Sequence, residues 1–196
     1  MKPRISTAAC SDDSLVEEIG RFRYDIYVDQ LGYPQSHADH ARRVIVDPLD
    51  ATAVNFYARA EGGEIVGVCR QNFCRDGMPD SYVALHRLQA PEHPQHTALT
   101  TRLMVREDYR LTRLPFALMR ACYEACVQAS IKYCHVDCYA PLVETFERLG
   151  FEFQFRGRHG DYGDVHCMRL DVDNGERLRS VRSPFYPVWR RLRGVG

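Results

Sequence analysis

Paired carboxylates and strand-borne arginines are the residues of this sequence best suited to chemistry. Asp47 and Asp50 are three positions apart in the segment Asp47-Pro-Leu-Asp50. Such carboxylates can hold an ammonium group and accept its proton; the plainer interpretation is that Asp50 caps a turn and Asp47 is solvated. Arg70 and Arg102 fall in predicted strands, where an unpaired buried guanidinium is costly. Each is expected to bind a substrate carboxylate or to pair with an acid, and an Arg102 pair with Asp47 or Asp50 is an equal alternative.

The cysteines suggest packing more than metal binding. Of eight cysteines, Cys122 and Cys126 are four positions apart, as are Cys134 and Cys138. Zinc knuckles usually show tighter C-x2-C spacing in loops, whereas these cysteines fall in apolar segments. We therefore expect no metal site and interpret the cysteines as small core residues.

The histidines give a weaker signal. His96 falls in an irregular segment, where it is a candidate base but where a solvated side chain is the commoner outcome. The sequence indicates no partner for His86 or His159.

Length and composition indicate a globular chain of one domain. It has 196 residues, 45% hydrophobic and 27% charged, enough for one domain with a core. Lys and Arg balance Asp and Glu at 26 each, which gives no indication of a nucleic-acid partner. No apolar run approaches the roughly 18 residues that span a bilayer, and residues 1–14 lack an apolar signal region. A cytoplasmic location is the resulting expectation.

Hydrophobic periodicity predicts alternating helices and strands around these residues. A helix is expected at 13–30, a surface loop at 36–48, a hairpin at 53–60 and 65–73, an irregular segment at 79–95, a strand at 98–105, a helix at 114–132, a strand at 134–139, a helix at 142–149 closed by Gly150, and a final hairpin at 151–155 and 165–172. This order predicts an α/β sheet with helices on both faces.

The C-terminal segment differs in composition from the rest. Residues 1–176 are expected to form the domain and residues 177–196 a basic tail with interspersed aromatic side chains. A membrane-binding basic patch is one interpretation of this tail, and we favour a surface-packed or mobile segment instead.

Residues 98–155 resemble the core of the GNAT (N-acetyltransferase) superfamily. The resemblance rests on the strand Leu99-Thr-Thr-Arg-Leu-Met-Val105, the helix that follows it, and the segment from Val136 to the closing Gly-Phe151. It implies a mixed, mostly antiparallel sheet with a central parallel pair of splayed strands and helices on both faces. It also implies that backbone N–H groups near Leu103 to Val105 polarise a thioester carbonyl.

Residues 15–110 resemble the acyl-homoserine lactone (autoinducer) synthases and the related N-acyl amino acid synthases. Arg23, Tyr27 and Tyr33 fit the first helix of these enzymes. Asp47 and Asp50 fit their paired acids, and the following strands fit at Tyr57, Gly67, Arg70 and Arg102. The resemblance implies transfer of a long-chain acyl group to the amine of an amino acid or similar small amine. Asp47, Asp50, Arg102, Leu103 and Val105 are then the catalytic candidates, and the substrate-binding candidates are Arg23, Tyr27, Tyr33, Arg70 and Cys138.

One departure from the GNAT pattern concerns the acyl donor. The Gly-rich loop that holds the pyrophosphate of coenzyme A is replaced by Arg110-Leu-Thr-Arg-Leu-Pro115, which contains no glycine. Arg110, Thr112 and Arg113 can still hold one phosphate, which favours the phosphopantetheine arm of acyl carrier protein over coenzyme A. A basic surface for that acidic partner is expected at Arg106, Arg110, Arg113 and Arg120. No tightly bound cofactor is expected.

Other departures concern proton transfer. Phe146 stands where many GNAT enzymes have a Tyr, and Leu99 where autoinducer synthases usually have a Glu. The acid and base therefore stay unassigned. A relay through the Cys138 thiol is the less favoured alternative to simple packing. Three alternative functions stay open: a lactone synthase using S-adenosylmethionine, a coenzyme A-dependent N-acetyltransferase, and a non-catalytic module that binds acyl thioesters.

Overall fold

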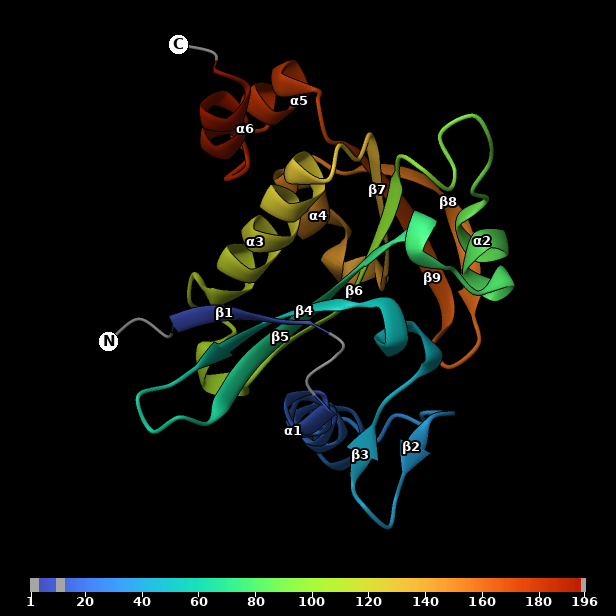
Figure 1. Cartoon of the computed structure of the whole chain (residues 1–196), viewed down its shortest axis with the longest axis vertical. Helices are drawn as coiled ribbons and strands as arrows, with labels where there is room; N and C mark the ends of the chain where they lie inside the picture. Colours follow the sequence, from blue (N-terminus) through green and yellow to red (C-terminus); the bar gives the residue numbers. More distant parts are fainter. Residues whose placement is uncertain (1–3, 10–12, 195–196) are drawn as a thin grey trace. The chain divides into compact units, whose positions relative to one another are not determined.

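The computed structural model describes residues 4–9 and 13–194 (Figure 1). The chain divides into two compact units. Unit 1 comprises Met1–Asn72 and Arg102–Met119, and unit 2 comprises Phe73–Thr101 and Arg120–Gly196. The division falls within strand β6 (Thr97–Val105) and helix α3 (Leu114–Gln128), so each contributes to both units. It also separates Phe73, the last residue of strand β5 (Ile65–Phe73), from the rest of that strand. Among the described residues, no helix has both the length and the apolar character needed to cross a membrane.

Unit 1 is built on strands in the order β1-β4-β5-β6. β1 (Arg4–Ala9) pairs antiparallel with β4 (Val54–Arg59), which pairs antiparallel with β5 (Ile65–Phe73). The predicted hairpin is confirmed, while β1 was not expected from the sequence. The predicted first helix is also confirmed: α1 (Asp13–Tyr24) continues as a π-helix over Asp25–Gln30. Two short 3₁₀ helices complete the unit, at Pro48–Thr52 and Glu107–Tyr109.

The segment predicted as a surface loop contains a small hairpin of β2 (Ala38–Asp39) and β3 (Val44–Ile45). Val44 and Ile45 are buried because α1 packs onto them at Gly20. A Cβ at Gly20 would come within 2.8 Å of Val44 Cγ1 and 3.1 Å of the Ile45 carbonyl oxygen. Only glycine therefore permits this close approach of helix and hairpin. Val44 and Ile45 alone interrupt the polar segment too briefly for the hairpin to be predicted from the sequence.

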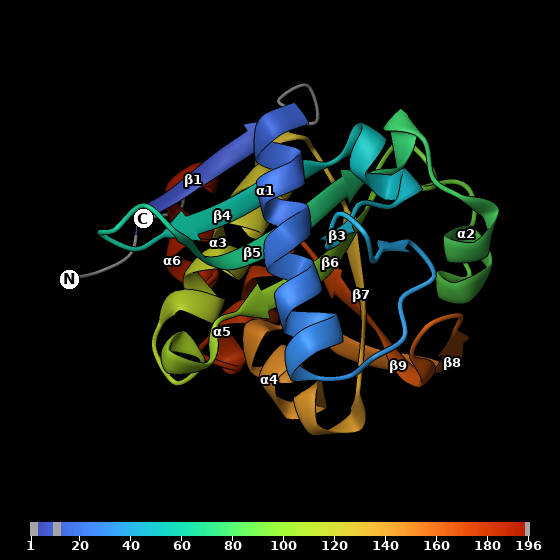
Figure 2. The ribbon, with the colours of Figure 1, turned by 90° about the horizontal axis from the view of Figure 1, so that it is seen from below.

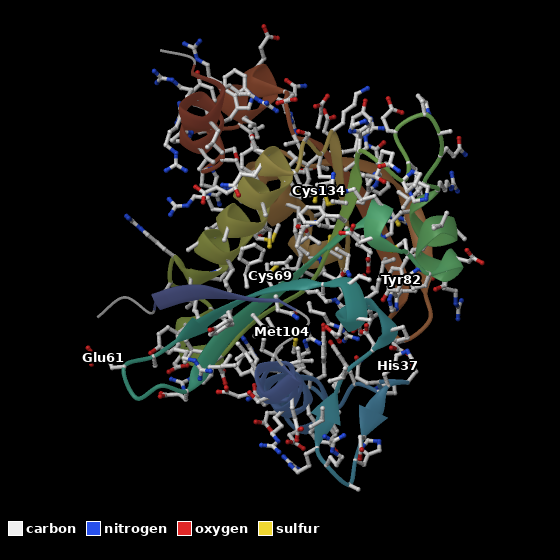
Figure 3. All side chains as sticks on the ribbon, viewed as in Figure 1. His37, Glu61, Cys69, Tyr82, Met104 and Cys134 are labelled. Atoms are coloured by element: carbon white, nitrogen blue, oxygen red, sulfur yellow. The ribbon has the colours of Figure 1, made fainter. Side chains whose placement is uncertain are left out.

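Helices cover both faces of the unit 1 sheet, so nearly every residue of β5 is buried. On one face Val68 and Met104 pack with Ile19 and Phe22 of α1, which runs across β4 and β5 (Figures 2 and 3). On the other face, Gly67 admits the side chains of Leu114 and Leu118 from the first turns of α3. The α1-facing side is also the side to which β5 and β6 direct the arginines described below.

Unit 2 has the strand order β6-β7-β9-β8. β6 and β7 (Tyr133–Cys138) are parallel, whereas β9 (Gly163–Asp171) is antiparallel to both β7 and β8 (Glu152–His159). The helix α4 (Val143–Leu149) ends at Gly150 with φ of 111°, as predicted for a glycine that closes a helix. 3₁₀ turns lie at Cys74–Asp76 and Ala140–Leu142.

The prediction of an irregular segment at 79–95 was wrong in part, because it contains helix α2 (Asp80–His86). The helix lies between Pro79, which precedes its first turn, and Pro91 and Pro94, which follow it. Proline is tolerated at such flanking positions, so the prolines bound the helix instead of excluding it. The predicted helix at 114–132 is shorter than expected and ends at Gln128.

The C-terminal segment folds into α5 (Gly175–Ser180) and α6 (Tyr186–Arg193). Phe185 is buried and stacks on Tyr123 with ring centroids 4.6 Å apart. Ser183 Oγ donates a hydrogen bond of 2.6 Å to the Leu149 carbonyl oxygen. These contacts agree with the surface-packed interpretation of this segment, although its helices were not expected.

Candidate active site

Asp47 and Asp50 begin the 3₁₀ helix Pro48–Thr52, where they form a capping box. Asp47 Oδ1 accepts from the Leu49 N–H at 3.0 Å, and Asp50 Oδ2 accepts from the Asp47 N–H at 2.9 Å. The expectation that Asp50 caps the turn and Asp47 is solvated was therefore wrong in part: Asp47 is the buried N-cap, and Asp50 is the N3 residue that completes the capping box. The cap fixes both carboxylates in one orientation and leaves the remaining lone pairs for arginines.

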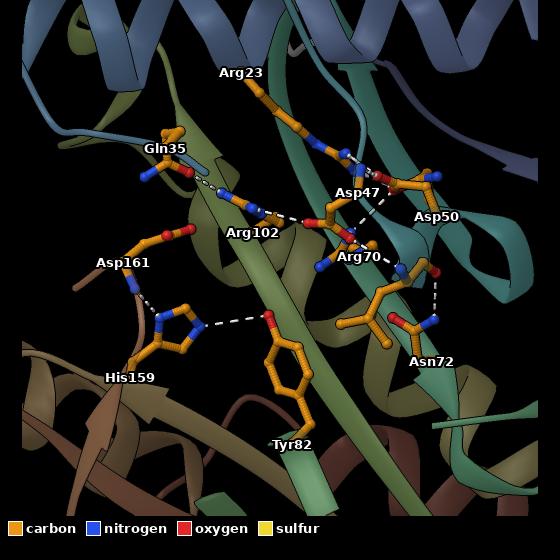
Figure 4. Close-up of polar contacts among 12 residues, drawn as sticks. Arg23, Gln35, Asp47, Asp50, Arg70, Asn72, Tyr82, Arg102, His159 and Asp161 are labelled. Carbon is orange, nitrogen blue, oxygen red and sulfur yellow. Dashed lines mark hydrogen bonds and ion pairs between the residues drawn. The ribbon is translucent and has the colours of Figure 1, made fainter. Parts of the chain in front are cut away.

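Three buried arginines converge on these two acids (Figure 4). Arg23 of α1 binds both oxygens of Asp50, at 2.9 and 2.8 Å. Arg70 of β5 donates to Asp47 Oδ1 at 2.6 Å and lies 3.1 Å from Asp50 Oδ1. The predicted ion pair of Arg102 is confirmed, because its Nη2 donates to Asp47 Oδ2 at 2.8 Å. The network therefore ties α1, the capped turn, β5 and β6 together.

Electrostatics keep Asp47 charged. Burial on its own raises the pKa of Asp47, but the charges of Arg70 and Arg102 outweigh it and hold that pKa well below the ordinary 3.8. Burial lowers the pKa of Arg23 despite the charge of Asp50, whereas for Arg70 the attraction of Asp50 and Asp47 outweighs burial and raises the pKa. A carboxylate with so low a pKa is a weak proton acceptor at neutral pH, so the geometry favours a positioning role for Asp47.

The depressed pKa of Asp47 predicts acid sensitivity. Because the unfolded chain binds this proton before the folded chain does, the stabilisation is present above about pH 4 and is lost as the pH falls further. Between pH 5 and 3 the free energy of unfolding, measured with urea, is expected to fall more steeply in the unmodified chain than in Asp47→Asn. Glu61→Gln, at an exposed position, is the control and should keep the steep fall. Equal slopes in all three proteins would show that Asp47 is not the group responsible.

Neutral polar residues complete the network, and they were not predicted from the sequence. Asn55 of β4, fully buried, accepts from Arg23 Nη2 at 2.8 Å. Gln35 accepts from Arg102 Nη1 at 2.7 Å, and Asn72 donates to the Leu49 carbonyl oxygen at 2.7 Å. Only the hairpin register could have pointed to Asn55, because this residue lies opposite Arg70 in the β4–β5 pair.

Arg102 also meets the predicted aromatic residues. Its guanidinium lies 5.2 Å from the ring centroid of Tyr27, and the rings of Tyr27 and Tyr33 are 6.5 Å apart. Arg102 has φ of 56°, a left-handed conformation within strand β6. Such a backbone costs on the order of 1–3 kcal/mol and occurs where the surrounding contacts impose it, commonly at functional bulges. The sequence-predicted residues Arg23, Tyr27, Tyr33, Asp47, Asp50, Arg70 and Arg102 are thus brought together within unit 1.

The predicted donor residues lie around the start of α3. Thr112 Oγ1 donates to the Tyr109 carbonyl oxygen at 2.7 Å and accepts from the Leu114 N–H at 3.1 Å. Arg110 Nε donates to the carbonyl oxygen of Val105, at 3.0 Å, and Arg113 is exposed. The Thr112 hydroxyl therefore already accepts a hydrogen bond from one N–H group at the start of the helix. The phosphate contact predicted for these three residues stays a prediction.

The parallel strands β6 and β7 stay paired over a short stretch only. Their ladder holds Thr97–Tyr133, Ala98–Cys134 and Leu99–His135. β7 continues to Cys138, and over these further residues its ladder partner is β9 on the opposite side. Val136–Cys138 therefore have no pairing partner in the β6–β7 ladder, as expected for splayed strands.

Cys138 lies at the end of β7 and is packed. Its thiol is buried and lies 3.7 Å from Met168 Sδ. Burial, and to a lesser extent the charge of Asp137, raises its pKa to about 12, so the thiol stays protonated. The seven described cysteines are all buried and form no disulfide, and no group of three or more His, Cys, Asp or Glu side chains suited to a metal ion occurs in the described part of the chain.

Cys138→Ala is therefore expected to keep turnover within about threefold of the unmodified chain and to lower stability by about 1 kcal/mol, because it removes packing only. Steady-state thiol release and urea unfolding measure the two effects. A loss of more than about 100-fold with unchanged folding would instead support the cysteine relay.

The fold and this network define the class of protein to which the chain belongs. The chain belongs to the acetyltransferase (GNAT) family, whose sequence model matches residues 21–151, and it is an acyltransferase. A search among curated protein sequences finds no match.

Solved structures with the same fold include autoinducer synthases. TofI in a ternary complex with an inhibitor and MTA is 20% identical, with a TM-score of 0.68 over 94% of this chain and 98% of that one. BjaI, a coenzyme A-dependent acyl-homoserine lactone synthase with SAM and isopentyl-CoA, is 17% identical, with a TM-score of 0.68 over 93% and 91%. An acyl-CoA N-acyltransferase from Pseudomonas aeruginosa is 15% identical, with a TM-score of 0.65 over 86% and 99%. At these identities the likeness concerns the fold.

Proposed function

We propose that this chain transfers an acyl group from a phosphopantetheine thioester to the amine of an amino acid or a similar small amine, by direct attack. The observation that carries this proposal is the early end of the β6–β7 ladder at Leu99 and His135. Backbone groups that leave a ladder can donate to a thioester oxygen in the transition state. The ion network supports the same function, since it fixes β6 at Arg102 and so orients the strand that carries Leu103 and Val105.

Acyl carrier protein is the proposed donor. The start of α3 has no glycine between Arg110 and Pro115, and Thr112 already occupies the Leu114 N–H. Fewer backbone N–H groups are then free for a pyrophosphate than in a glycine-rich loop, whereas the carrier's arm has a single phosphate. Arg110 and Arg113 provide positive charge for it, and a small amine completes the reaction.

A lactone synthase using S-adenosylmethionine is the second candidate. Its support is the fold shared with TofI and BjaI, whose structures contain MTA or SAM. Leu99 weakens it, because this fully buried apolar residue stands where the resemblance to those enzymes places a Glu.

The test follows free thiol while the protein is incubated with acyl carrier protein thioesters or coenzyme A thioesters of several chain lengths. Mixed amino acids and S-adenosylmethionine are supplied in separate arms. Release with the carrier and an amino acid supports the proposal; release only with S-adenosylmethionine supports the lactone synthase. Release only with coenzyme A overturns the proposed donor, and no release with any donor favours a non-catalytic module.

A further inference from the structure

A buried histidine–carboxylate pair in unit 2 has no role in the chemistry described so far. His86, the last residue of α2, places Nε2 3.2 Å from Oδ1 of Asp137 on β7. The His86 side chain is fully buried and that of Asp137 is 9% exposed. The two residues are 51 positions apart in the sequence, so the fold alone brings them together.

The hydrogen bond between His86 and Asp137 has a defined direction. His86 Nδ1 is buried and has no hydrogen-bond partner among the described residues. A proton on Nδ1 would leave a buried donor unsatisfied and would remove the donor that Asp137 needs, so the neutral ring carries its proton on Nε2. His86 therefore donates to Asp137 Oδ1, while Asp137 Oδ2 accepts no hydrogen bond from the described part of the chain.

Asp137 is also placed where the parallel strands separate. His135 is the last β7 residue in the ladder with β6, and Asp137 lies two residues further, about 7 Å along the strand. Side chains alternate along β7, so Asp137 shares a face with His135 while Val136 and Cys138 point to the opposite, buried face. The ring contact of His86 with His135, at 5.8 Å, places α2 over this same face.

Other titratable groups of this region are less suited to receive a proton. Burial raises the pKa of the Cys138 thiol to about 12, and burial lowers the pKa of His135 to about 3. His159 has both nitrogens engaged, with the Asp161 N–H at 3.1 Å and the Tyr82 hydroxyl at 3.4 Å. Asp137 faces His86 of α2, Cys138 of its own strand and Cys167 of β9. Around these residues and His135 lie three further charged or titratable groups, namely Arg87 directly after α2, His93, and Arg169 of β9.

We propose that Asp137 accepts the proton of the acceptor amine as the amide bond forms, and that His86 is the positioning residue behind it. This inference rests on the proposed acyl transfer. The amine nitrogen bonds to the thioester carbon, its proton passes to Asp137 Oδ2, and the carbon–sulfur bond breaks to release the thiolate. The proton then neutralises that thiolate, so the products are an amide and a free thiol.

The test uses the full chain with the donor that the unmodified protein accepts. Asp137→Asn is expected to lower kcat about 100-fold or more, leave the KM for the donor within about threefold, and abolish the low-pH limb of kcat. Asp137→Glu should keep that limb at a reduced rate. His86→Gln should give a smaller loss and shift the limb. Asp164→Asn, an exposed carboxylate of β9, is the matched control and should behave as the unmodified chain.

Two results separate the outcomes. If the pair only fastens α2 to β7, Asp137→Asn and His86→Gln lower the melting temperature while kcat and its pH profile stay unchanged, and the proposal is wrong. If the unmodified chain releases thiol from no donor, the acyl transfer itself fails, and that result is distinct from a failure of Asp137.

Discussion

Replacing Arg102 by alanine is expected to lower kcat/KM by about 100-fold or more and stability by about 3 kcal/mol. Arg102 holds Asp47 at 2.8 Å and Gln35 at 2.7 Å from a strand position with a left-handed backbone. Without it, Asp47 loses one of its two arginines and the end of β6 loses its anchor. Thiol release measures the first effect and urea unfolding followed by circular dichroism the second.

Two further variants isolate the cause. Arg59→Ala removes a half-exposed ion pair with Glu18 and should change turnover less than twofold. Arg102→Gly removes the same guanidinium as Arg102→Ala but suits the positive φ, so it should be more stable than the alanine variant by about 1 kcal/mol. If the glycine variant also recovered turnover, backbone geometry and not the guanidinium would be the determinant.

The residue types of this network followed from the sequence, but of their pairing only the ion pair of Arg102 with one of the two acids was anticipated. A guanidinium inside a strand must have a partner, so Arg70 and Arg102 implied acids, and Asp47 and Asp50 were the acids at hand. The specific pairs depend on which elements pack together. Arg23 reaches Asp50 across 27 positions because α1 lies over the capped turn. Asn55 gave no comparable signal, because asparagine is usually a surface or turn residue.

Short elements were the least predictable part. α2 spans Asp80–His86, about two turns, which is too short for a helical period to stand out between prolines. Missing this helix also hid the partner of His86, because Asp137 is reached only when α2 packs on β7. In contrast, β5 at Ile65–Phe73 was predicted to the residue, since a long apolar run next to a clear turn has few alternatives.

The largest stability effect is expected at Arg23. Arg23→Met should lower the free energy of unfolding by about 3–5 kcal/mol, because the buried Asp50 carboxylate loses both hydrogen bonds from Arg23 Nη1 and keeps only Arg70, at 3.1 Å, as a cationic partner. Asn55 also loses the donor that satisfies its oxygen. Urea unfolding at pH 7 measures the loss, and Arg21→Met, an exposed residue of the same helix, is the control with an expected change below about 1 kcal/mol.

Removing both charges should be less harmful than removing one. In Arg23→Met combined with Asp50→Leu, the carboxylate that lost its hydrogen bonds from Arg23 is absent, and Arg70 keeps its bond to Asp47. Arg23 Nε is buried without a hydrogen-bond partner among the described residues, so the pair carries a desolvation cost that the apolar pair avoids. The double variant should therefore recover at least about half of the lost stability.

Turnover should stay low, because Asp50 also accepts the Asp47 N–H and so orients the carboxylate that holds Arg102. Full recovery of both stability and turnover would mean that the buried ions serve neither the fold nor the reaction.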